Sequence, residues 1–132
     1  MATVRHLRAS RNALLSELLD EALGMRTEEV MRLFHFGAVY HSKSSAIQFK
    51  EHNMTPVRLL KDLQVEIGDY IRVHPNPRIF PTYDEVDWKK RIIDIFPRFI
   101  LVNKPAGVPS HATSDNRWQN CMEGVRSALG VQ

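Results

Sequence analysis

The chain has 132 residues, of which 43% are hydrophobic and 25% charged, with a formal net charge of +3 and a pI near 9.2. These values are close to globular averages and argue against a largely disordered chain. The length allows one domain, or a small domain with part of another. The mild positive charge permits a polyanionic partner without requiring one.

Cysteine and histidine usage gives no sign of a metal or disulfide framework. The only cysteine, Cys121, cannot form an internal disulfide, and the six histidines show no metal-ligand spacing. No apolar run approaches the ~18 residues that cross a membrane. We therefore expect no metal, no cofactor and no membrane partner.

The amino terminus carries Arg5, Arg8 and Arg11 and no acidic residue before Glu17. We interpret residues 1–11 as a basic arm, with an organellar targeting segment as the alternative. The protein is expected to be soluble and intracellular, and its compartment stays open between the cytoplasm, a chloroplast and a mitochondrion.

Two helices and two strands are predicted next. Apolar residues recur at helical spacing over 14–23 before Gly24, and again from Thr27 to Gly37, and Ser10 or Asn12 could cap the first helix. Short strands are predicted over residues 38–41 and 70–73, because in the second of these stretches apolar and polar residues alternate.

The sequence GMRTEEVMRLFHFGAVY at 24–40, with GDYIRV at 68–73, resembles the small RNA-binding domain named after the fourth small-subunit ribosomal protein (S-four type). The resemblance covers about residues 12–75. It implies an RNA-binding face, for which the basic candidates are Arg11, Arg26, Arg32, His35 and Lys43. Without the resemblance, a solvated helix face beside two glutamates is the favoured interpretation. Residues 42–56 look like an insertion in this domain.

Prolines at 75, 77 and 81 mark a domain boundary, and residues 76–91 are predicted to form an extended, proline-rich linker. Strands are expected over residues 92–95 and 99–102, joined by a hairpin turn. A helix capped by Asp115 should follow, because apolar residues recur after it at intervals of three and four.

The strand at 99–102 runs into a loop that carries a second resemblance. The sequence VNKPAGVPSH at 102–111 resembles the first motif of RluA-type RNA pseudouridine synthases, a strand and loop bordering the active-site cleft. The resemblance implies that this cleft is lined by Asn103, Lys104, Pro105, Gly107 and His111. By pattern alone, an ordinary turn at a strand end is the alternative.

The family's next motif, His-Arg-Leu-Asp, supplies its catalytic aspartate and does not occur in these residues. The resemblance thus assigns no catalytic residue here, and residues 92–132 would be an incomplete start of the catalytic domain. The expected fold is α+β: a helix-helix-strand RNA-binding domain, then the first strands and a helix of a mostly antiparallel sheet.

Two functions remain open at this stage. The first is RNA binding as the amino-terminal portion of a synthase that isomerises uridine to pseudouridine in rRNA or tRNA. The alternative is a non-catalytic RNA- or ribosome-binding protein derived from such an enzyme.

Overall fold

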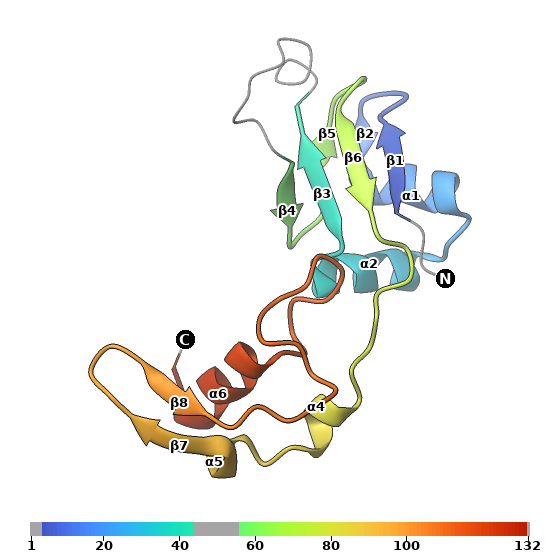
Figure 1. Cartoon of the computed structure of the whole chain (residues 1–132). Coiled ribbons are helices and arrows are strands. Elements are labelled where there is room, and N and C mark those ends of the chain that lie inside the picture. The colour runs from blue at the N-terminus through green and yellow to red at the C-terminus, as the bar shows by residue number, and fades with distance from the viewer. Residues whose placement is uncertain (1–3, 44–55, 132) are drawn as a thin grey trace. The chain divides into compact units, whose positions relative to one another are not determined.

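The computed structural model describes residues 4–43 and 56–131 and divides the chain into two units, residues 1–78 and 79–132 (Figure 1). Both units combine helices with antiparallel strand pairs, which agrees with the predicted α+β class. Within the described ranges, no helix is long and apolar enough to cross a membrane.

The first unit begins its helical part with α1 (Leu15–Leu23) and α2 (Thr27–Phe36). Both helices end where predicted, at Gly24 and Gly37, whose φ angles of 64° and 68° are in the left-handed region that favours glycine. The side chains that the two helices bury together are Leu15, Leu18, Leu19, Val30, Leu33 and Phe34.

A four-stranded antiparallel sheet, ordered β1-β6-β3-β4, packs against these helices. Its strands are β1 (Arg5–Arg8), β6 (Tyr70–Val73), β3 (Val39–Ser42) and β4 (Val57–Leu59). Its apolar face joins the helical core through Leu7, Val39, Leu59, Ile71 and Val73. The predicted strands at 38–41 and 70–73 are confirmed to within one residue.

The basic arm predicted for residues 1–11 is wrong for Arg5–Arg8, which form strand β1 at the edge of this sheet. The physical reason is that β6 needs partners for the backbone groups of its outer edge, and Leu7 packs against the core. The next residue, Ala9, is buried and exchanges backbone hydrogen bonds with residues 68 and 69. Residues 1–3 lie outside the described residues.

A two-stranded sheet joins β2 (Ala13–Leu14) to β5 (Gln64–Val65) and places the residues before β6 next to the start of α1. Of the insertion predicted at 42–56, residues 44–55 lie outside the described residues. Its first residue, Ser42, ends β3.

The second unit contains a hairpin and three helices. The hairpin pairs β7 (Ile92–Ile95) with β8 (Ile100–Val102), as predicted, and the helices are α4 (Thr82–Glu85), α5 (Trp88–Arg91) and α6 (Cys121–Leu129).

The extended linker predicted at 76–91 is wrong over α4 and α5. Trp88 is 8% exposed and forms the core of this unit with Val108 and Val125, and its indole nitrogen donates to the Tyr83 carbonyl at 3.2 Å. Burying so large a ring fixes the backbone around it, which the proline content of the segment did not reveal.

The helix predicted to start after Asp115 instead begins at Cys121. Its cap is Asn120, whose side-chain oxygen accepts a 2.9 Å hydrogen bond from the Glu123 amide. Asp115 accepts a hydrogen bond from the Thr113 hydroxyl within a preceding turn. Asp and Asn cap helices equally well, so spacing alone could not choose between them.

Candidate nucleic-acid interface

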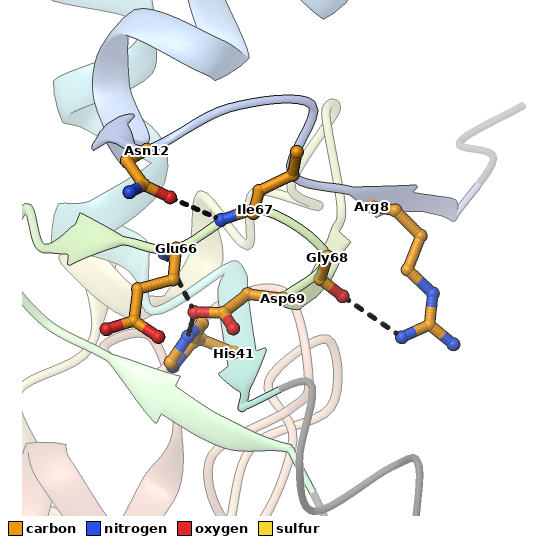
Figure 2. Close-up of polar contacts among 7 residues, drawn as sticks. All are labelled: Arg8, Asn12, His41, Glu66, Ile67, Gly68 and Asp69. Carbon is orange, nitrogen blue, oxygen red and sulfur yellow. Dashed lines mark hydrogen bonds and ion pairs between the residues drawn. The ribbon is translucent and has the colours of Figure 1, made fainter.

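The turn at Gly68 and Asp69 holds the strands of the first unit together (Figure 2). The Asp69 carboxylate is fully buried and accepts from the Glu66 amide at 3.1 Å and from His41 Nε2 at 2.9 Å. The side-chain oxygen of Asn12 accepts from the Ile67 amide at 2.8 Å. These contacts connect β1, β3 and β6, so the Gly-Asp pair has a structural role.

The first predicted RNA contact, Arg11, lies just before β2 and forms two 2.7 Å hydrogen bonds with Glu21 of α1. The hydrogen bond to Glu21 raises the pKa of Arg11, and the same bond lowers the pKa of Glu21. Both groups are therefore charged at neutral pH and largely offset each other.

Three predicted contacts lie on the exposed side of α2. Arg26, just before the helix, forms a 3.0 Å ion pair with Glu29. Arg32 lies 4.8 Å from the centroid of the Phe36 ring, and His35 meets the same ring edge-on at 5.6 Å. The structure thus brings Arg32 and His35 together around Phe36.

The fifth predicted contact, Lys43, is exposed and directly follows β3. Because β3 leads the chain away from α2, Lys43 lies at the other end of the sheet from Arg32 (Figure 1). The structure therefore does not assemble the five predicted residues into one cluster.

The Lys-Pro loop after β8 is stabilised by its own lysine. Lys104 Nζ donates to the carbonyls of Pro105 at 3.1 Å and Val108 at 2.7 Å, and Pro105 and Val108 are buried. Gly107 has φ 85°, and a Cβ there would lie 3.1 Å from Thr82 Oγ1. Glycine is thus required both by the backbone angle and by the nearby helix α4.

Asn103 and His111 lie at the two ends of this loop with exposed side chains. The Asn103 amide donates to the Arg91 carbonyl at 2.8 Å, and His111 Nδ1 lies 3.2 Å from the Ala112 carbonyl oxygen. The contacts of Lys104 and Gly107 shape the loop, whereas Asn103 and His111 present polar atoms to solvent.

An open groove of about 800 Å³ runs between the β7–β8 hairpin and α6. Its lining is mostly apolar, with Phe99, Leu101 and Met122 all largely exposed, and includes Lys104 from the predicted motif. Cys121 also lines the groove, and partial burial raises the pKa of its thiol, which is protonated at neutral pH.

Sequence reasoning missed a buried amide cluster in the loop before α6. Asn116 is fully buried, its side-chain oxygen accepts from the amides of Trp118 and Gln119, and its side-chain nitrogen donates to Gln119 at 3.0 Å. The Gln119 oxygen in turn accepts from the Phe80 amide at 2.7 Å. The run of small polar residues from Thr113 to Asn120 was the available signal.

Among the described residues, no group of three or more histidine, cysteine, aspartate or glutamate side chains could hold a metal ion. The arrangement that the structure does offer is one of exposed cations, some beside aromatic rings. Such groups suit phosphates and bases.

Comparison with known proteins gives two similar curated proteins. The chain is 35% identical over 69 residues to a protein of Oryza sativa subsp. japonica named chloroplastic RNA pseudouridine synthase 6, and 38% identical over 66 residues to one of that name from Arabidopsis thaliana. The matches cover 52% and 50% of this chain but 14% of each relative. No protein-family profile and no solved structure matches the chain.

Proposed function

We propose, from the relationship of this chain to RNA pseudouridine synthases over half its length, that it is the RNA-docking portion of such an enzyme. Residues 12–75 bind rRNA or tRNA, and residues 92–132 contribute the first elements of the domain that isomerises uridine to pseudouridine. The single observation that carries the proposal is the agreement of two relatives of the same name. Their shared description as chloroplastic favours that compartment.

The geometry of α2 supports RNA docking by the first unit. Arg32 and His35 lie on one exposed face beside Phe36, with Arg26 one turn earlier. Guanidinium groups bind phosphates in a forked geometry, and an aromatic ring beneath Arg32 limits the freedom of its side chain. Arg26 would exchange its ion pair with Glu29 for a phosphate.

The β7–β8 hairpin supports the assignment of the second unit. Ile93, Ile95 and Phe99 are 63%, 57% and 61% exposed, so the hairpin presents large apolar side chains to water. Isolated hairpins are marginally stable, and contiguous apolar surface of this kind is normally covered by other structure. The hairpin would therefore be part of a larger catalytic sheet.

The test of RNA docking is the double substitution Arg26→Ala with Arg32→Ala. We expect weaker binding to a structured rRNA or tRNA fragment, and a slope of log affinity against log salt that falls by roughly 0.7 to 0.9 per lost phosphate contact. Fluorescence anisotropy at several KCl concentrations measures both quantities.

The matched control is Lys89→Ala with Lys90→Ala, which removes the same charge from exposed positions of the second unit. If the α2 variant and this control have the same salt slope, net charge explains the effect and the α2 face is not the docking surface.

These 132 residues are expected to bind RNA without isomerising uridine. The family's chemistry belongs to an aspartate in a motif that they lack, and Asp94 precedes the Lys-Pro motif on β7. Positioning without the reacting carboxylate leaves the main barrier in place. Pseudouridine is quantified by mass spectrometry of digested RNA against an RNA-only control. Turnover that Asp94→Asn abolishes would contradict the assignment.

A further inference from the structure

The four-stranded sheet has a second face, opposite the helical core, that the resemblance did not single out. Paired residues of antiparallel strands point to the same side of a sheet. The register pairs His6 with Arg72, Arg8 with Tyr70, and Tyr40 with both Arg72 and Arg58. The residues that therefore share this face are His6, Arg8, Tyr40, Ser42, Arg58, Tyr70 and Arg72.

This set, called here the Arg–Tyr face, contains three arginines and two tyrosines and no acidic residue among its strand positions. Two cations of the helical side, Arg11 and Arg26, instead form ion pairs with Glu21 and Glu29. A sheet face whose strand residues carry charge of one sign only is complementary to a polyanion.

The tyrosine rings hold the arginines in place. Arg58 donates to the Tyr40 hydroxyl from Nε at 3.0 Å and from a terminal nitrogen at 2.6 Å. The Arg72 guanidinium lies 4.3 Å from the centroid of the same ring. Two guanidinium groups are thus fixed around one buried tyrosine, which lowers the entropy lost when they bind an anion.

The β1 side of the face repeats this arrangement with a more open ring. Arg8 lies 5.6 Å from the Tyr70 ring centroid, and the imidazole of His6 stacks on that ring at 5.9 Å with an interplanar angle of 18°. His6 is exposed, so a further flat group can continue the stack. An unpaired RNA base is such a group, whereas bases in a duplex are covered by their neighbours.

We propose that the Arg–Tyr face binds an unpaired strand of RNA that crosses the sheet from β1 to β4. Phosphates contact Arg8, Arg72 and Arg58, and one base stacks on His6. Three strand spacings separate β1 from β4, about 14 Å in all, which is enough for a short strand. The inference rests on the proposed function for its ligand class, and adds a second surface and a preference for unpaired RNA.

The decisive variant is Arg8→Gln with Arg58→Gln, which removes two charges and keeps polar side chains of similar length. The probes are a labelled single strand of roughly 12 nucleotides and an RNA duplex of the same length, each titrated by anisotropy over a range of KCl concentrations. The salt slope for the single strand should fall by about 1.4, from two lost contacts at about 0.7 each.

Two further variants separate the roles within this face. His6→Ala should weaken binding of the single strand and leave duplex binding unchanged, because only an unpaired base can stack there. Lys89→Gln with Lys90→Gln is the control of equal charge change. If Arg58→Gln disturbs the sheet, as circular dichroism would show, Arg8→Gln with His6→Ala replaces it, since both of those residues are exposed on the edge strand.

Loss confined to the Arg–Tyr variants, with single-strand binding most affected, supports the proposal. A single-strand slope equal to that of the lysine control overturns it. In that case the proposed function still stands if Arg26→Ala with Arg32→Ala weakens binding to structured RNA. Failure of the unsubstituted protein to bind any RNA overturns both.

Discussion

Substitution of Asp69 by alanine is expected to lower the free energy of unfolding of the first unit by about 3 kcal/mol. The carboxylate is fully buried and accepts from the Glu66 amide and from His41, which is itself 8% exposed (Figure 2). Removing it leaves two buried donors without their acceptor. Because small domains are stable by only about 5 to 15 kcal/mol, this is a large fraction of the total.

Urea denaturation followed by far-ultraviolet circular dichroism measures the effect. The matched control is Glu66→Ala, which removes a neighbouring exposed carboxylate and keeps the Glu66 amide. Asp69→Asn should fall between the two, because its amide retains one accepting oxygen. Equal midpoints for Asp69→Ala and Glu66→Ala would show that the buried contacts contribute no net stability.

Substitution of Gly124 by alanine is expected to destabilise the second unit by about 2 to 3 kcal/mol. A Cβ at this position would lie 2.3 Å from atoms of the Trp88 indole, so the ring or α6 must move. Elsewhere in a helix the same change is stabilising, because alanine has the higher helix propensity. The sign of the effect therefore reports the close approach of Trp88.

Tryptophan fluorescence follows this unit selectively, because the only two tryptophans of the chain are Trp88 and Trp118. Ser127→Ala, at an exposed position of the same helix, is the control and should be neutral or slightly stabilising. A Gly124→Ala variant that melts at or above the temperature of the unsubstituted protein would contradict the packing described here.

The sequence by itself determined the elements that depend on neighbouring residues. The helices ending at Gly24 and Gly37 follow from apolar spacing and from a residue that accepts the left-handed conformation. The hairpin at 92–102 follows from two short apolar runs with a proline between them. The relationship to pseudouridine synthases was also carried by local motifs.

The candidate site was predicted only in part. The cationic side of α2 could be read from the three-residue spacing of Arg32 and His35. The ion pair between Arg11 and Glu21 and the contacts of Lys104 with its own loop could not, because they depend on side-chain rotamers and on how the chain folds back.

Only the tertiary structure decided the contacts between distant residues. The start of α1 is not capped by Ser10 or Asn12, but by Asp62, which accepts from the Ser16 amide at 3.0 Å across 46 residues. Likewise β1 and the Arg–Tyr face exist only because β6 pairs with strands from both sides of the helices. Strand partner and register are set by which surfaces the whole core buries, and a short polar strand such as Arg5–Arg8 carries no local signal of either.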